Sequence, residues 1–242
     1  MRKKNLKGIN IYCFYTIGII LFLNINSCAY NDFQKVSNTG YEFISGHLQE
    51  NYDGICLKYG KVYETKQKKL REIVSEYEYK EDLTDKIGNN IMFFAIMAND
   101  ISHVKKFVNK GASLKVQDGT LFHHAAHYAS NDVLDFLLSK GLNQDETNQY
   151  GATPLMVAAF ENRIEAVKWF IAHGANINAK AKNEETALSY AVVCRNKELI
   201  HEIIRSGAEL TNKAVEVGRK RGIDLNKEAS IALRPATDSI KK

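Results

Sequence analysis

Four glycines recur at an almost constant interval, and this period constrains the fold more than any other feature of the sequence. Gly111, Gly141, Gly174 and Gly207 are separated by 30, 33 and 33 residues. Each glycine stands 21 residues after the start of one of four related strings, which read NIMFFAI, TLFHHAA, TPLMVAA and TALSYAV. Two series of landmarks in one register predict four copies of a single structural unit.

Each unit has the pattern of two short helices joined by a turn. A threonine that opens a string can accept a hydrogen bond from an exposed backbone amide, and Pro154 loses no hydrogen bond in the first helical turn. In the second half of each unit, apolar residues fall at i, i+3 and i+4 and predict one buried stripe. The three aligned columns are Val104, Leu134, Val167 and Ile200; Phe107, Leu137, Phe170 and Ile203; and Val108, Leu138, Ile171 and Ile204. Because one unit cannot cover its own stripe, the units must stack into one elongated core.

The unit resembles the ankyrin repeat, whose signature is T-P-L-H-x-A. The third unit, from Gly151 to Ala179, carries the resemblance best, whereas the first lacks the Thr and the Pro, and the fourth has Ala181 and Glu184 where the family prefers Asp and Gly. The resemblance implies an all-α fold, a solenoid of helix-turn-helix units with short β-turn or hairpin connections and helical caps at both ends. Within a repeat region of residues 86–211, we expect four repeats at about 86–115, 116–146, 147–179 and 180–211.

Helical caps are expected on both sides of the repeats. Residues 28–85 form a tether and an N-terminal cap, in which a helix at 61–79 is predicted from apolar residues at Val62, Leu70, Ile73, Val74 and Tyr77. After Gly207 the pattern decays, and residues 214–221 and 225–233 predict a terminal helix pair around Gly222. Residues 212–242 are thus a degenerate capping repeat with a basic tail, which is more often a solvated face than a binding patch.

The first 28 residues have the layout of a signal peptide. A basic head, MRKKNLK, precedes an apolar run of 13 residues from Ile11 to Leu23 and a polar stretch that ends at Cys28. A membrane-spanning helix needs roughly 20 apolar residues, so a retained anchor is the weaker interpretation.

The stretch Ile25-Asn26-Ser27-Cys28 resembles a relaxed form of the lipobox of bacterial lipoproteins. This resemblance implies removal of residues 1–27, lipid attachment at Cys28, and a bacterial cell-envelope location on a membrane, at its periplasmic face or at the cell surface. The abundance of Lys, Asn and Ile is similar to that of spirochaetal proteins. The alternative is that Cys28 is an ordinary cysteine after a simple secretory signal.

Composition and charge exclude several classes. The apolar share of 45%, with 15 Gly, 2 Pro and 4 Cys, excludes collagenous, disordered and disulfide-framework chains. The net charge is +5, but four basic residues and no acidic ones lie in the first 27 positions, which leaves +1 for the rest. We therefore expect no nucleic-acid partner.

One cluster of histidines has a spacing that is compatible with metal binding. His123 and His127 lie at i and i+4, where two histidines can share a zinc ion, but a zinc-protease string would need Glu at the position of His124 and no third ligand is evident. The family resemblance instead gives His123 a structural hydrogen bond between turns. We expect no catalysis, no metal and no cofactor, with a metal-dependent enzyme built on this cluster as an alternative.

Two cysteines remain once Cys13 is removed and Cys28 is acylated. We expect Cys56 and Cys194 to be free, buried or partly buried thiols. A disulfide between them is the alternative in an exported protein.

The resemblance to ankyrin repeats implies binding of a protein partner of unknown identity through the turn tips and the ends of the first helices on the concave side. In register, it assigns this surface to Met97, Ala98, His127, Tyr128, Gln149, Tyr150, Ala152, Phe160, Glu161, Lys182, Asn183, Glu185, Val193 and Cys194. Some of these residues can instead pack between neighbouring turns.

We therefore expect a lipid-anchored scaffold whose soluble part is monomeric. The second hypothesis is a structural envelope protein that associates with itself through a convex patch at Phe136 and Trp169. Packing between repeats is the other interpretation of these two aromatic residues.

Overall fold

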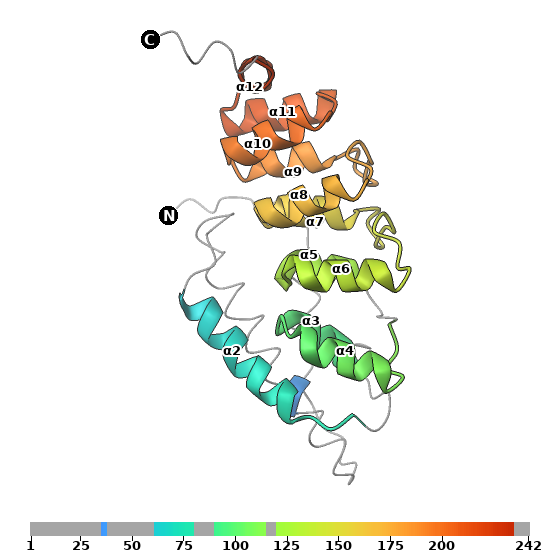
Figure 1. The fold of residues 1–242 in the computed structure, drawn as a ribbon. Helices are drawn as coiled ribbons and strands as arrows, with labels where there is room; N and C mark the ends of the chain where they lie inside the picture. The colour runs from blue at the N-terminus through green and yellow to red at the C-terminus, as the bar shows by residue number, and fades with distance from the viewer. Residues whose placement is uncertain (1–34, 38–60, 80–89, 115–119, 235–242) are drawn as a thin grey trace.

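A computed structural model of the 242-residue chain describes residues 35–37, 61–79, 90–114 and 120–234. In these parts the chain forms helices and no strand, and consecutive helices stack as pairs (Figure 1). The pairs are α3 (Ile91–Met97) with α4 (Ile101–Asn109), α5 (Leu121–Tyr128) with α6 (Asn131–Ser139), α7 (Pro154–Phe160) with α8 (Ile164–Ala172), α9 (Ala187–Val193) with α10 (Lys197–Arg205), and α11 (Asn212–Arg221) with α12 (Leu225–Ala232). The expected all-α solenoid is confirmed.

The first helix of each pair begins at a polar cap, as the repeated strings predict. Thr153 Oγ1 accepts a hydrogen bond from the Met156 amide, and Pro154 occupies the first position of α7. In the first pair Asn90 replaces the threonine, and its Oδ1 accepts from the amide of Met92 at 3.0 Å. The first helix of this pair is therefore capped even without the threonine, because asparagine is an equally good N-cap residue.

First helices form the central layer of the stack. α3 packs on α5, α5 on α7, α7 on α9, and α9 on α11. Most residues of α3, α5, α7 and α9 are buried, and the alanines at their centre, such as Ala126 and Ala159, are fully covered. Helix α11, at the end of the layer, buries only Ala214 and Gly218. Small side chains let neighbouring backbones approach closely, which explains why alanine recurs at these positions.

Second helices form an outer layer that is buried on one stripe. Two of the three predicted columns are fully buried in every pair, as Val104 and Phe170 illustrate. The third column is only partly buried at Val108, Leu138 and Ile171 and is fully buried only at Ile204. The buried stripe is therefore narrower than predicted, because the third position lies at the rim of the contact with the neighbouring pair.

The turns between pairs are tied to one another by repeated hydrogen bonds. The Asn176 amide donates to Asp145 Oδ1 at 3.0 Å, and the Glu209 amide donates to Asn178 Oδ1 at 2.9 Å, one repeat later. Gly151 has φ +75°, and a Cβ atom there would lie 3.0 Å from the Lys182 amide nitrogen of the next turn. Only glycine suits this position, because it combines a left-handed backbone with a close approach of the next turn.

Helix α2 (Lys61–Glu76) packs on the first pair and covers one end of the stack. Leu70 and Val74 are fully buried, and the Tyr77 ring lies edge-on to Phe107 at 6.0 Å. The predicted helix at 61–79 thus ends at Glu76, with its apolar face on the array as the pattern indicates.

The terminal pair holds a buried carboxylate. Glu228 is 5% exposed and lies 2.7 Å from His201 Nε2 and 2.9 Å from Lys197 Nζ, both on α10. Hydrogen bonds from Lys197 and His201 lower the pKa of Glu228. Gly222, with φ 72°, ends α11 and turns the chain into α12. This pair differs from the others in leaving Leu233 63% exposed at the end of the stack.

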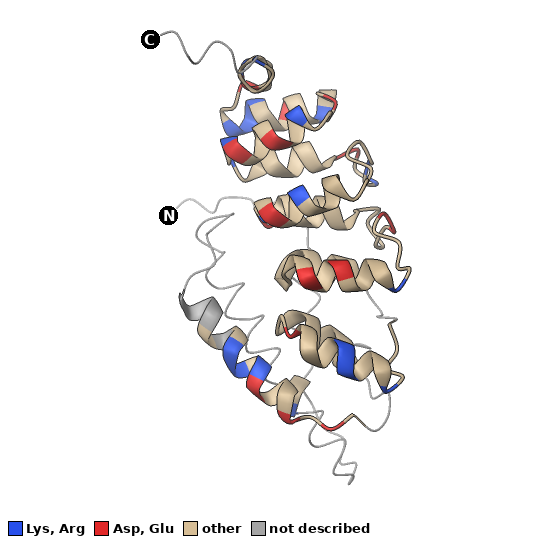
Figure 2. Cartoon of the chain, viewed as in Figure 1, with Lys and Arg blue, Asp and Glu red and all other residues tan. Residues whose placement is uncertain are grey.

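Charged residues of both signs are interspersed over the described helices (Figure 2). No single-sign stripe follows the stack in this view. Among the residues that the structure describes, no helix combines the length and apolar character needed to cross a membrane.

Candidate functional site

The residues assigned to the partner-binding surface lie in two regions. The turn tips, which comprise residues 148–152 and 181–185, precede α7 and α9 and project from one side of the stack (Figure 1). The helix ends, which comprise residues 97–98, 127–128, 160–161 and 193–194, lie at the other end of the first helices, along the side where α2 runs. A helix of seven residues such as α7 separates the two regions by about 10 Å.

The helix end of the first pair is covered, so the prediction that Met97 and Ala98 face a partner is wrong. Both residues are fully buried. Gln67 Nε2 donates to the Met97 carbonyl at 3.0 Å, and Arg71 Nε donates to the Ala98 carbonyl at 3.1 Å. Helix α2 therefore takes the place that the repeat pattern alone leaves for a partner.

The helix end of the second pair is held by charged groups of the third. Arg163 donates to the His127 carbonyl at 2.6 Å and to the Ala129 carbonyl at 2.5 Å. Glu161 Oε1 lies 3.2 Å from His127 Nδ1, and the Tyr128 ring stacks on the His127 ring at 5.3 Å. His127, Tyr128 and Glu161 remain partly exposed, so they present an amphipathic surface that is fixed in position.

The helix ends of the third and fourth pairs are apolar and aromatic. The Phe160 ring, which is partly exposed, lies edge-on to Tyr190 at 5.8 Å. Val193 and Cys194 lie at the end of α9 and are also partly exposed. These residues continue the helix-end surface beyond the part that α2 covers.

Cys194 is disulfide-bonded, so the expectation of a free thiol is wrong for this residue. Its Sγ atom lies 3.0 Å from the Phe160 carbonyl oxygen. A disulfide sulfur carries no proton and donates no hydrogen bond, whereas a reduced thiol at this position would donate to that carbonyl. Cys56, its partner in the alternative that the sequence left open, lies outside the described residues, as do Cys13 and Cys28.

The turn tips are ordered by asparagine side chains. Asn148 Oδ1 accepts from the amides of Tyr150 at 3.0 Å and Ala152 at 3.1 Å, and Asn183 Oδ1 accepts from the Glu185 amide at 3.2 Å. These bonds satisfy backbone amides that would otherwise need water or a partner.

Most of the predicted tip residues are accessible. Gln149, Lys182 and Asn183 are exposed, while Tyr150 and Glu185 are partly exposed. Ala152, however, is 2% exposed, so its assignment to the binding surface is wrong. Its carbonyl oxygen lies inside the stack, where His123 binds it.

His123 joins the second pair to the turn before the third. It is 4% exposed, and its Nε2 lies 2.8 Å from the Ala152 carbonyl oxygen. The Thr120 amide donates to Nδ1 at 3.1 Å, so Nε2 carries the proton and donates to Ala152. Burial is the main cause that lowers the pKa of His123 to about 4. This is the structural hydrogen bond between turns that the resemblance implies.

The histidine cluster does not assemble a metal site. Both ring nitrogens of His123 are hydrogen-bonded, the His124 ring lies edge-on to Phe93 at 4.6 Å, and His127 pairs with Glu161. Within the described parts of the chain, no group of three His, Cys, Asp or Glu side chains is placed to hold a metal ion.

The aromatic residues of the second helices pack between repeats. Trp169 is 5% exposed, donates from Nε1 to Asp135 Oδ1 at 2.7 Å, and stacks against His173 at 4.0 Å. Phe136 is partly buried, with the ammonium group of Lys140 5.2 Å from its ring centre. The two residues thus lack the exposed apolar area that a convex association patch requires.

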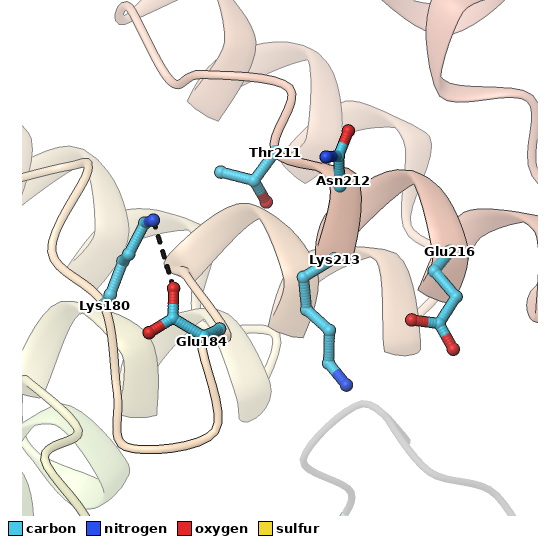
Figure 3. Close-up of a pocket in the computed structure, with 6 residues that line it drawn as sticks. All are labelled: Lys180, Glu184, Thr211, Asn212, Lys213 and Glu216. Carbon is cyan, nitrogen blue, oxygen red and sulfur yellow. Dashed lines mark hydrogen bonds and ion pairs between the residues drawn. The ribbon is translucent and has the colours of Figure 1, made fainter.

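A shallow hollow lies between the turn before α9 and the start of α11 (Figure 3). Its lining residues are Lys180, Glu184, Thr211, Asn212, Lys213 and Glu216, and Lys180 pairs with Glu184 at 3.1 Å. The two lysines and two glutamates balance in charge, and no buried nucleophile or convergent acid and base faces the hollow. It therefore offers no basis for a catalytic site.

Comparison with known proteins identifies the repeats. Residues 122–214 match the family model of ankyrin repeats, in three copies. The chain is 30% identical over 153 residues to an ankyrin repeat protein of Fowlpox virus, covering 59% of this chain and 45% of the relative. It is 29% identical to an E3 ubiquitin-protein ligase of Arabidopsis thaliana, covering 55% of this chain and 30% of the relative. It is 28% identical to a palmitoyltransferase of Danio rerio, covering 57% of this chain and 23% of the relative.

This chain spans less than half the length of each of these three relatives. The enzymes among them match over the smaller shares of their length, 30% and 23%, so the likeness concerns a repeat region and not an established activity of this chain. Together with the stacked helix pairs, the matched residues show that this chain contains ankyrin repeats that form a solenoid.

Proposed function

We propose that this chain is a lipid-anchored ankyrin-repeat scaffold that binds another protein and performs no catalysis. Ankyrin repeats support the general role of a protein-interaction scaffold. The observation that carries the proposal is the pair of exposed, internally hydrogen-bonded turn tips, whose backbone is ordered before any partner arrives. Order in the free protein lowers the entropy cost of binding.

The proposed contact surface has a central and a peripheral part. The turn tips offer Gln149, Tyr150, Lys182, Asn183 and Glu185, a mixture of aromatic, polar and charged side chains that suits an interface. The partly exposed helix ends add His127, Tyr128, Phe160, Glu161 and Val193 at the side. Tyrosine is the residue type of this set expected to contribute most to the binding energy.

The anchor and the location are proposed from the sequence, because residues 1–34 lie outside the described part of the chain. The leader of residues 1–27 would be removed, and lipid on Cys28 would hold the protein on a membrane of a bacterial envelope. Residues 28–85 would then link the lipid to the repeats of residues 86–211, which residues 212–242 close.

Site-specific photo-crosslinking tests the contact surface. A benzoylphenylalanine residue at position 182, in place of the exposed Lys182, should form one dominant protein adduct in the native cell. The matched control is the same residue in place of Lys106, which is also exposed but lies on the second helix α4. We expect at least tenfold more adduct at position 182, and equal yields at the two positions would contradict the assignment.

Substitution of one cysteine tests the anchor. Cys28→Ala should abolish cleavage and membrane attachment, because each buried methylene of an acyl chain contributes about 0.8 kcal/mol and two or three chains hold a domain on a bilayer. The measurement is the intact mass and detergent partitioning of protein from native membranes. Cys13→Ala is the control and should leave both unchanged. Normal processing and partitioning of the Cys28→Ala protein would refute the lipid anchor.

A further inference from the structure

We propose that the ends of helices α9 and α11 form a docking site for an acidic segment of the partner protein. The site comprises Arg195, Arg219 and Arg221, and we call it the arginine site. Arg195 follows α9, and the other two residues lie in the last turn of α11. Because α9 packs on α11 and both helices end on the side where α2 runs, the two ends are neighbours (Figure 1). This inference rests on the proposed function and specifies the chemistry of the partner.

The last turn of α11 differs from the last turns of the other first helices. Arg219, Lys220 and Arg221 end α11, whereas α3, α7 and α9 have no basic residue in their last turn (Figure 2). A basic residue near a helix C-terminus interacts favourably with the helix dipole. Three first helices of the same array nevertheless form without one, so the dipole does not account for three basic residues in α11.

Arg195 occupies a position whose backbone suits asparagine better. Its φ is 56°, in the left-handed region that residues other than glycine seldom adopt and that asparagine tolerates best. The equivalent residues of the first and third pairs are Asn99 and Asn162, with φ 53° and 56°. Asn99 Oδ1 accepts from the Ser130 amide at 2.8 Å, and Asn162 Oδ1 accepts from Asn196 Nδ2 at 2.6 Å. Arginine forgoes both advantages, and such strained residues cluster at functional sites.

The carboxylates within α11 and α12 are engaged by other cations. Glu216 of α11 pairs with Lys220, which removes the one lysine of the last turn from the available charge. Glu228 of α12 is buried and lies 2.9 Å from Lys197 Nζ and 2.7 Å from His201 Nε2. Neither carboxylate therefore neutralises the arginine site.

The three guanidinium groups of the arginine site have no partner in the described parts of the chain. Asp224 lies three residues after Arg221 but caps α12, where its Oδ1 accepts from the Lys227 amide at 3.1 Å. Among the described residues, the side chains of Arg195, Arg219 and Arg221 form no hydrogen bond and no ion pair. Arg195 and Arg219 are exposed, and Arg221 is partly exposed. Their charges are therefore available to carboxylates of another molecule.

Apolar side chains flank the arginine site. Phe160 and Val193, at the ends of α7 and α9, are partly exposed, and α7 packs on α9. An acidic peptide that also carries apolar side chains can therefore contact both parts of this surface. Glu198, which is exposed on α10 three residues after Arg195, would repel a long polyanion such as a nucleic acid. The surface thus favours a short acidic segment of a protein.

Arginine is well suited to this role. A guanidinium group is planar and can donate two parallel hydrogen bonds to one carboxylate, which a lysine ammonium group cannot do. Arginine is also among the residue types that contribute most to protein interfaces. The arginine site therefore extends the helix-end surface from the third and fourth pairs to the fifth.

Binding of a synthetic peptide tests the site. The full chain in a non-ionic detergent is titrated into a short fluorescein-labelled peptide of aspartate, glutamate and leucine, and the fluorescence anisotropy is measured. The triple variant Arg195→Glu, Arg219→Glu, Arg221→Glu should raise the Kd by about tenfold or more. The matched control is Lys105→Glu, Lys106→Glu, Lys110→Glu, which makes the same change of charge at exposed positions in and after α4. We expect this control to change the Kd by less than about twofold.

Several outcomes would overturn the arginine site. One is an equal loss of binding in both triple variants, which would indicate an effect of net charge alone. Another is equal binding of a peptide with lysine in place of its acidic residues. Tighter binding of phosphatidylglycerol vesicles or single-stranded DNA than of the acidic peptide would assign the surface to a lipid or a nucleic acid. Circular dichroism should show unchanged helical content in both variants, because all the substituted side chains are at least partly exposed.

Photo-crosslinking connects the site to the native partner. Benzoylphenylalanine in place of Lys220, between two arginines of the site, should form an adduct whose crosslinked partner peptide is rich in aspartate and glutamate. A crosslinked peptide without an excess of acidic residues, or no protein adduct, would overturn the proposal. If position 182 still forms its dominant adduct in that case, the proposed function stands and only the arginine site is refuted.

Discussion

Phe170→Ala is expected to lower the free energy of unfolding by about 3–5 kcal/mol, as truncation of a fully buried phenylalanine does. Phe170 lies in α8, is 0% exposed, and contacts Phe122 of the preceding pair with ring centres 6.0 Å apart. It also lies edge-on to Trp169 at 5.2 Å. The missing ring would leave a cavity between two repeats, which rigid neighbours on both sides cannot refill.

Urea denaturation followed by circular dichroism measures this loss. Phe136→Ala is the matched control, because it removes the same side chain from the second helix of the preceding pair, where the ring is only partly buried beneath lysine ammonium groups. We expect the control to lose less than about 1.5 kcal/mol. Equal losses in the two variants would show that the outer rim and the buried column contribute alike.

The solenoid architecture adds a second expectation for Phe170→Ala. Each helix pair contacts only its neighbours, so stability is a sum of pair and interface terms. A weak interface between the second and third pairs should let the two parts unfold separately, which lowers the slope of the denaturation curve. A variant that shifts the midpoint and keeps the wild-type slope would indicate that the array still unfolds as one unit.

The repeated part of the fold could be predicted because the same types of residue recur at the same positions in each unit. A polar cap, small central residues, an apolar stripe and a glycine at fixed offsets each dictate one local feature, and a spacing of 30 or 33 residues aligns them. Four pairs in register then leave little freedom in how they stack. Even a local departure, such as Asn90 in place of threonine, kept the prediction valid because asparagine satisfies the same amides.

The exposed part of the binding surface was harder to predict, because the repeat sequences do not indicate which other segments pack against the helix ends. Met97 and Ala98 have the same register as partly exposed residues of later repeats and are nevertheless buried. The cause is α2, whose Gln67 and Arg71 bind backbone carbonyls that any sequence would present. Polar residues on a cap helix do not reveal such partners, whereas the apolar face at Leu70 and Val74 does indicate the packing.

The disulfide at Cys194 was only the alternative in the sequence analysis, for a related reason. Two cysteines far apart in sequence carry no information on their distance until the path of the intervening chain is known. The structural hydrogen bond of His123, in contrast, was predicted correctly, because it involves only one repeat and the turn that follows it.

The substitution His123→Gln should destabilise the protein at pH 7 but not at pH 4. At neutral pH we expect the variant to lose about 1–2 kcal/mol, because glutamine can still donate to the Ala152 carbonyl while the Thr120 amide loses its acceptor. In the wild type, burial, opposed by the hydrogen bond to Ala152 and assisted by the charge of His127, lowers the pKa of His123 to about 4. The native protein therefore stays neutral at this site where the unfolded chain already binds a proton.

The sign of the pH effect follows from that difference. With an unfolded pKa of about 6.5, the stabilisation by neutral His123 is complete above that pH and is lost as the pH falls towards 4, by about 3 kcal/mol in all. Denaturation curves of wild type and His123→Gln at pH 7 and pH 4 isolate this residue, because the other groups contribute equally to both proteins. The variant should be less stable than the wild type at pH 7 and as stable or more stable at pH 4. A difference that stays constant between these pH values would mean that His123 is protonated as readily in the folded array as in the unfolded chain.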